Sequence, residues 1–72
     1  MIKNVALIGA GSISKVHIEG YKSVPGIQIA AICDLNESLA QARAQEYGIP
    51  KYYSDYHEVL ADPTIDAVSV VT

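Results

Sequence analysis

The chain of 72 residues has a single cysteine, Cys33, and neither tryptophan nor phenylalanine. One cysteine excludes an internal disulfide, and a lone thiol at the end of an apolar run is expected to behave as a small buried hydrophobic group. A reduced cysteine is typical of cytoplasmic proteins, so we expect this compartment. All five aromatic residues are tyrosines, and their polar hydroxyl groups suit the rim of a core better than its centre.

Basic residues are also scarce. The five Lys and Arg residues are scattered among eight Asp and Glu residues, which gives a net charge of −3. Without a basic patch, we expect no nucleic-acid binding. No apolar run approaches the roughly 20 residues of a membrane span, and the first residues lack the layout of a signal peptide. No group of His, Cys, Asp and Glu has metal-ligand spacing, so no metal site is expected.

Half of the residues are hydrophobic, and they are grouped in runs that alternate with helical segments. The predicted strands are Ile2–Ile8, Ile27–Cys33, Lys51–Tyr53 and Asp66–Thr72. The predicted helices are Ser12–Ser23, Glu37–Tyr47 and Asp55–Ala61. Such alternation predicts an α/β fold with right-handed crossovers and a parallel sheet. We expect a partial Rossmann fold of about four strands, in the order 3-2-1-4, with helices on both faces.

Local signals support these segments. Asn36 is a suitable N-cap and Gly48 a suitable C-cap for the second helix, whose charged residues Glu37, Arg43 and Glu46 are expected on an exposed face. In the third helix we expect Val59 and Leu60 to turn inward. Along the first helix, apolar and small residues fall near one side at helical spacing: Ile13, Val16, Gly20, Tyr21 and Val24.

The glycine turn after the first strand carries the main functional signal. Gly9 permits a tight turn, and Gly11 has no Cβ, so an anion can approach its backbone. The N–H groups around Ser12 and Ile13, at the start of a helix, would face that anion. In the pattern G-x-G-x-x-G the third glycine allows close packing of the helix on the strand, and here Ser14, another small residue, stands in that place.

An acidic residue ends the second strand. Asp34 lies 23 residues beyond Gly11, where a carboxylate can accept hydrogen bonds from the ribose hydroxyls of an adenosine. It would repel a 2′-phosphate, and no Arg or Lys follows nearby, so the sequence favours NAD over NADP. Another adenosine compound is a third, weaker hypothesis. The alternative interpretation is structural: the glycines serve only a tight connection, and Asp34 merely precedes a helix cap.

The chain resembles the N-terminal domain of the glucose–fructose oxidoreductase, inositol dehydrogenase and rhizopine-catabolism (Gfo/Idh/MocA) family. Three segments carry the resemblance, which covers essentially the whole chain: GAGSISKVH at 9–17, IAAICDLN at 29–36, and YGIPKYYSDYHEVLADPTIDAVSVVT at 47–72. The resemblance implies an NAD(P)-dependent oxidoreductase that transfers hydride between a nicotinamide cofactor and a sugar, a polyol or a related hydroxyl compound.

The resemblance also implies roles for single residues. The phosphate loop of the family matches Gly9, Gly11, Ser12, Ile13 and Ser14, its ribose-recognition site matches Asp34 and Leu35, and its threonine beside the nicotinamide matches Thr72. Residues 1–72 are then expected to form the N-terminal part of a dinucleotide-binding domain. The substrate domain and the catalytic lysine of the family are absent, so we assign no catalytic residue and expect the chain alone to be inactive.

Two further hypotheses concern the remaining features. An uncovered sheet edge can pair with another chain, which allows a homo-oligomer, and a non-enzymatic nucleotide-sensing or interaction module is the alternative function. Of the two histidines, we expect His17 to be a packing or capping residue and His57 to be solvated.

Overall fold

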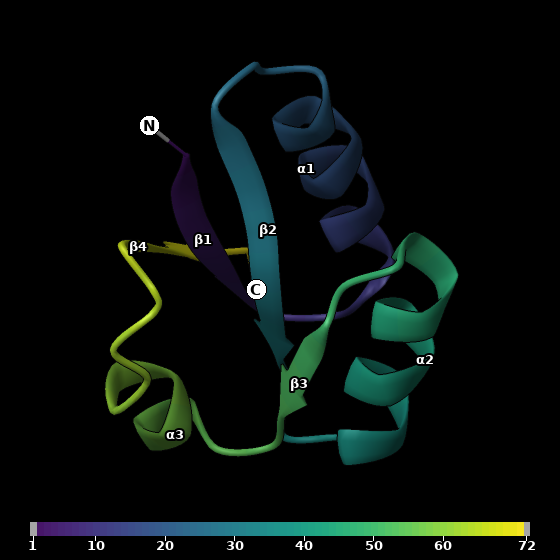
Figure 1. Cartoon of the computed structure of the whole chain (residues 1–72). Helices are drawn as coiled ribbons and strands as arrows, with labels where there is room; N and C mark the ends of the chain where they lie inside the picture. Colours follow the sequence, from purple (N-terminus) through teal and green to yellow (C-terminus); the bar gives the residue numbers. More distant parts are fainter. Residues whose placement is uncertain (1, 72) are drawn as a thin grey trace.

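The computed structural model describes residues 2–71 and forms a four-stranded parallel sheet in the order β3-β2-β1-β4 (Figure 1). The strands are β1 (Lys3–Ile8), β2 (Ile27–Cys33), β3 (Lys51–Tyr53) and β4 (Ala67–Val70). The helices are α1 (Ser12–Lys22), α2 (Glu37–Tyr47) and α3 (Tyr56–Leu60). The predicted fold class and strand order are confirmed. Because every pair is parallel, the carboxyl ends of all strands meet at one edge of the sheet.

The second crossover has the bounds that the sequence predicts. The Asn36 side chain accepts a hydrogen bond from the Leu39 N–H at 3.2 Å and so caps α2. Gly48 ends the helix in the left-handed conformation, with φ of +68°, a value that glycine adopts without steric cost. Helix α2 is therefore delimited by two local signals that need no tertiary contact.

The predicted bounds of other elements are too long by one or two residues. Ile2 lies outside β1 and is exposed. Ser23 is the C-cap of α1 rather than its last residue. Asp55 and Ala61 cap α3, and Asp66 precedes β4. These ends lie where cap residues adopt non-helical or half-helical geometry, the part of an element that sequence defines least.

Separate cores cover the two faces of the sheet. Helices α1 and α2 pack on one face, and α3 lies on the opposite side (Figure 1). The first core joins the side chains Leu7, Ala10, Ile18, Ile29, Ile32, Ala44, Ile49 and Val71. The second joins Ala6, Ala31, Cys33 and Val59. Cys33 is buried, as its apolar context predicts. Both cores contact β1 and β2, so these central strands are the most enclosed part of the sheet.

The buried side of α1 differs from the predicted apolar side. Ser14 and Ile18 are fully buried, whereas Ile13, Val16 and Val24 are exposed by 60%, 70% and 43%. The prediction followed apolar residues, but the small Ser14 lets the first turn of the helix approach the sheet closely. In α3, likewise, Val59 is buried and Leu60 is 65% exposed, because a helix of five residues has room for only one inward side chain on this face.

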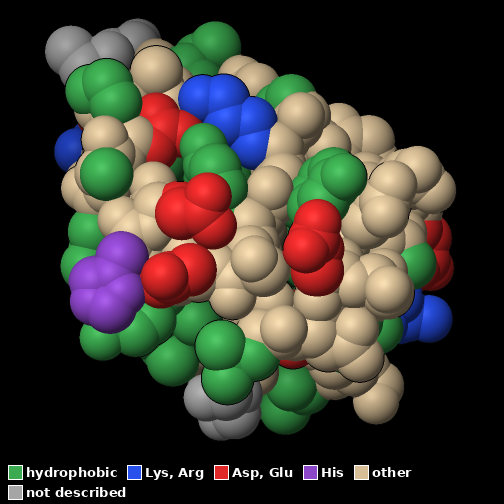
Figure 2. Space-filling view, turned by 90° about the horizontal axis from the view of Figure 1, so that it is seen from below, with side chains coloured by type: hydrophobic (Ala, Val, Ile, Leu, Met, Phe, Trp, Pro, Cys, Tyr) green, Lys and Arg blue, Asp and Glu red, His purple; other side chains and the backbone are tan. Residues whose placement is uncertain are grey.

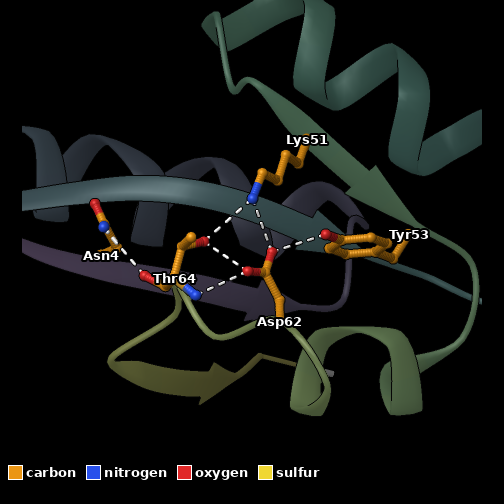
Figure 3. Close-up of polar contacts among 5 residues, drawn as sticks. All are labelled: Asn4, Lys51, Tyr53, Asp62 and Thr64. Carbon is orange, nitrogen blue, oxygen red and sulfur yellow. Dashed lines mark hydrogen bonds and ion pairs between the residues drawn. The ribbon is translucent and has the colours of Figure 1, made fainter.

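A carboxylate beyond α3 ties that helix and β4 to the rest of the sheet (Figure 3). Asp62 accepts hydrogen bonds from Lys51 at 2.9 Å and from the Tyr53 hydroxyl at 2.8 Å, both on β3. It also accepts from the hydroxyl and N–H of Thr64, and the Thr64 carbonyl accepts from the Asn4 side chain at 3.1 Å. The Thr64 and Lys51 bonds hold the pKa of Asp62 well below its usual range.

We predict that Asp62 makes the fold acid-sensitive. Because its pKa is lowered in the folded state, its contribution is present above the unfolded value near 4 and is lost as pH falls below it. Asp62→Asn should lower the free energy of unfolding at pH 7 and reduce its dependence on pH between about 5 and 2. Urea unfolding followed by circular dichroism at several pH values measures both effects. Glu19→Gln, which alters an exposed carboxylate on α1, should keep the wild-type slope; an equal slope in Asp62→Asn would contradict the prediction.

Candidate functional site

The glycine turn between β1 and α1 is rigidly held although it contains two glycines. Gly9 has φ of +116°, a conformation that side chains disfavour, and its N–H donates to the Cys33 carbonyl at 2.7 Å. Ala10 is fully buried. Gly11 has ordinary φ and ψ, and a Cβ placed on it would meet nothing within 4 Å. Gly9 is thus required by the backbone, whereas Gly11 leaves open space at the surface of the turn.

The amino end of α1 faces that open space. Gly11 is its N-cap, and within residues 2–71 no side chain caps the helix. Its first N–H groups, at Ser12 and Ile13, have no acceptor within the helix, and both residues are exposed. The hydroxyl of the buried Ser14 donates to the Gly11 carbonyl at 2.6 Å. Together with the helix dipole, this arrangement suits an anion such as a pyrophosphate.

Asp34 turns its carboxylate toward the glycine turn. One oxygen accepts a hydrogen bond from the Ala10 N–H at 2.9 Å, and the other accepts from the Asn36 N–H at 2.9 Å. Each carboxylate oxygen has two lone pairs, so both can accept a further hydrogen bond. The structure therefore brings the two sequence signals, the turn and the acidic residue, into direct contact.

A cavity of about 280 Å³ opens beside this contact, at the carboxyl ends of the strands. Leu35 is 90% exposed and Tyr56 is 49% exposed, so both have apolar surface available to a ligand. The full lining comprises Ile8, Gly9, Cys33, Asp34, Leu35, Ser54 and Tyr56. The volume is close to the roughly 300 Å³ at which small-molecule sites begin. It fits a nucleoside, and a mainly apolar wall with one carboxylate suits an adenine and its ribose.

Ser54 and Tyr56 are site residues that the sequence analysis did not select. Ser54 directly follows β3, and Tyr56 begins α3 two residues later. In the predicted order 3-2-1-4, the end of β3 lies beside the end of β2, so topology was the signal that could have identified them. Thr72, the residue predicted beside the nicotinamide, lies outside the described residues.

The electrostatics of the cavity are set by carboxylates. Burial, and then the adjacent Asp34 charge, raise the pKa of the Cys33 thiol above its usual value, so the thiol stays neutral at physiological pH. Figure 2 views the molecule from the side on which the strands end, and acidic side chains lie nearer the middle of this view than the Lys and Arg side chains do. Such a surface is unfavourable for an additional phosphate on the ribose.

Two predictions about other polar residues are wrong. Arg43 was expected on an exposed helix face with Glu37 and Glu46, but its side chain is only 12% exposed and contacts the glycine turn. His17 was expected to pack or to cap, and it is exposed. His57 is exposed, as predicted.

Residues 2–71 contain neither a metal-ligand group nor a membrane-spanning helix. In that range no three His, Cys, Asp or Glu side chains are grouped to hold a metal ion. None of its helices has the length and apolar character needed to cross a membrane.

Residues 3–72 match the Gfo/Idh/MocA family, described as an oxidoreductase family with an NAD-binding Rossmann fold. The scyllo-inositol 2-dehydrogenase (NAD(+)) of Bacillus subtilis is 40% identical over 68 residues, and the myo-inositol 2-dehydrogenase of Thermotoga maritima is 35% identical over 66. These alignments cover 93% and 92% of this chain, and 20% of each relative. The chain therefore spans about a fifth of the length of these relatives.

The chain is also similar in structure to solved oxidoreductases. The myo-inositol dehydrogenase from Lactobacillus casei, in complex with NAD(H) and myo-inositol, superposes with a TM-score of 0.91 at 31% identity. An oxidoreductase from Agrobacterium radiobacter, in complex with NAD+, L-tartaric acid and magnesium, gives 0.93 at 32% identity. Each superposition covers 100% of this chain, and 22% and 21% of the respective solved chains.

We predict that alanine destabilises the fold more at Gly9 than at Gly11. Gly9→Ala should lower the free energy of unfolding by about 1–3 kcal/mol, because a side chain is strained at this positive φ. Gly11→Ala should cost less than about 1 kcal/mol, the usual difference between these residues at an N-cap. Thermal and urea unfolding of both variants measure the contrast. Equal losses would mean that the backbone of the turn differs from the one described.

Proposed function

The chain belongs to the Gfo/Idh/MocA oxidoreductase family, and we propose on this premise that it holds the adenosine and pyrophosphate parts of NAD. Residues 1–72 would form the N-terminal part of a dinucleotide-binding domain. The observation that supports this most is the hydrogen bond between Asp34 and the Ala10 N–H. This contact holds the Asp34 carboxylate beside the glycine turn, so a single dinucleotide could reach both.

The pyrophosphate would lie over Gly11, at the start of α1. The open space where a Cβ would stand allows close approach to the backbone. The N–H groups of Ser12 and Ile13 would donate to the phosphate oxygens, with the helix dipole behind them. Ser14 would not contact the phosphates, because its hydroxyl is bound to the Gly11 carbonyl within the protein; its contribution would be to let α1 pack closely on the sheet.

The adenosine would occupy the cavity beside β2 and β3. The remaining lone pairs of Asp34 would accept hydrogen bonds from the ribose hydroxyls. Leu35 and Tyr56 would contact the adenine through their exposed apolar surfaces. A 2′-phosphate would face the Asp34 charge, and this repulsion supports NAD rather than NADP as the cofactor.

The complete reaction would need residues outside this chain. Bound NAD supplies a hydride acceptor at its nicotinamide, and Thr72 would stand near that half of the cofactor. We propose a sugar, a polyol or a related hydroxyl compound as the substrate, because the relatives include inositol dehydrogenases. The chain covers only about a fifth of the length of these relatives. This small share supports assigning the substrate domain and the catalytic group to a longer protein.

The outer edge of β4 favours a second candidate, an interaction module. Within residues 2–71 β4 pairs only with β1, and its side chains Val68 and Val70 are 40% and 68% exposed. A strand from the same longer protein or from a second copy could pair with this edge. Sedimentation of the purified chain, with calorimetric titration of NADH, would distinguish the candidates: a dimer without nucleotide binding would favour the module.

We predict that Gly11→Ala separates binding from folding. The added methyl group should occupy the space proposed for the pyrophosphate, and affinity for ADP-ribose should fall at least about tenfold, with adenosine affinity nearly unchanged. Isothermal titration calorimetry with the two ligands measures this difference. Gly20→Ala serves as the control, because a Cβ at this helical position also meets open space, far from the turn. Equal affinity of Gly11→Ala and wild type for ADP-ribose would contradict the proposed place of the pyrophosphate.

We predict that Asp34 determines the preference between the two dinucleotides. Asp34→Ala should weaken NADH binding about tenfold or more, since hydrogen bonds to charged groups are the stronger ones. NADPH binding should change less, because the same substitution removes a repulsion. Calorimetric titration of both dinucleotides gives the ratio. Asp66→Ala, at the opposite end of the sheet beside Asn4, should leave the ratio unchanged, and equal losses of both dinucleotides in Asp34→Ala would argue against ribose recognition.

A further inference from the structure

Arg43 reaches from α2 to the middle of the glycine turn. Its Nε–H donates to the Ala10 carbonyl at 3.1 Å, and its Nη1 donates to Glu46 at 2.7 Å. The side chain is mostly buried, in a helix whose other charged residues are exposed. This contact joins α2, the helix between β2 and β3, to the loop between β1 and α1. Its partners are 33 residues apart in the sequence.

Both polar backbone groups of Ala10 are thereby held by side chains. The N–H donates to Asp34 and the carbonyl accepts from Arg43. In a trans peptide the carbonyl and the following N–H point in opposite directions, and the Ala10–Gly11 bond is trans. Because Arg43 draws the Ala10 carbonyl toward α2, the Gly11 N–H is directed away from α2.

We propose that Arg43 is a positioning residue of the pyrophosphate-binding turn, an inference that rests on the proposed function. A segment of Gly-Ala-Gly has large backbone freedom, and fixing it before the ligand arrives reduces the entropy lost on binding. Arg43 supplies that constraint: it orients the Ala10–Gly11 peptide plane, whose N–H, at Gly11, would lie beside the pyrophosphate together with those of Ser12 and Ile13. Without this bond the backbone of Ala10 would keep only its contact with Asp34. The bonds at Gly9 and Ser14 would remain, but the Ala10–Gly11 peptide plane could rotate.

The charge of Arg43 contributes less than its geometry. Glu46 lies 2.7 Å from the guanidinium and offsets its charge, and the Arg43 hydrogen bond lowers the pKa of Glu46, which keeps this carboxylate ionised. Lys15 is also near Glu46, at 3.6 Å, and is about half exposed. A planar guanidinium can donate to the carbonyl and the carboxylate at once, in fixed directions, which an ammonium group cannot do.

The test compares Arg43→Met with two matched controls, Lys15→Met and Glu46→Gln. Lys15→Met removes a positive charge from the same cluster without changing a contact of the turn. Glu46→Gln removes the charge partner and retains the bond from Arg43 to Ala10. In the chain without ligand, ¹⁵N relaxation of the Gly11 amide should show a lower order parameter in Arg43→Met and wild-type order in both controls. Arg43→Lys, which keeps the charge and lacks the Nε–H, replaces Arg43→Met if that variant does not fold.

The affinities provide a readout that a general loss of stability would not change. Arg43→Met should bind ADP-ribose about tenfold more weakly and adenosine within about twofold of wild type, and Lys15→Met should bind both within about twofold. Unchanged Gly11 order in Arg43→Met, or an equal loss of ADP-ribose affinity in Lys15→Met, would overturn the inference. If the wild-type chain bound neither ligand, the proposed function would fail, and the relaxation data would still decide whether Arg43 orders the turn.

Discussion

The contact between the Asp34 carboxylate and the Ala10 N–H is the constraint on which the site depends. It joins the end of β2 to the turn after β1, two segments that the parallel sheet already brings to the same edge. The proximity of these two segments alone would still allow the glycine turn many conformations. The hydrogen bond selects one of them, and it leaves both carboxylate oxygens able to accept from a ligand. Asp34 thereby links the position of the turn to the position proposed for a ribose.

The packing of α1 on the sheet also helps to fix the glycine turn. Ser14 is fully buried and donates to the Gly11 carbonyl. A larger side chain there would force the helix away from the sheet, and its first N–H groups would move with it. The replacement of the third glycine of the motif by serine therefore preserves close packing and adds one hydrogen bond across the first turn. The open space at Gly11 and the buried position of Ser14 both follow from the position of α1 on the sheet.

How far the sequence predicts this structure depends on the range of each interaction. Helix α2 has the predicted bounds because Asn36 and Gly48 act within one turn of the chain. The strand order follows from the alternation of elements, and it brings Asp34 to the turn without further information. The buried side of α1 was not predicted, because it is decided by close approach rather than by hydrophobicity. Arg43 was missed for a related reason: an arginine on a helix is usually solvated, and only the fold shows that it lies within reach of Ala10.

The enclosed part of the sheet lies beside the sites proposed for adenosine and pyrophosphate. Its exposed part lies where the nicotinamide half would extend. Strands β1 and β2 are covered on both faces, and Ser54 and Tyr56, which come after β3, complete the cavity proposed for adenosine. Strand β4 lies on the other side of β1, where the nicotinamide half would extend, and it has exposed side chains and one unpaired edge within the described residues. Residues that bind a nucleoside and a pyrophosphate can therefore be held in place by this chain, whereas walls around a nicotinamide would have to come from additional structure beside β4. It follows that, under the proposed function, the binding energy from this chain would be concentrated at the adenosine end of the dinucleotide.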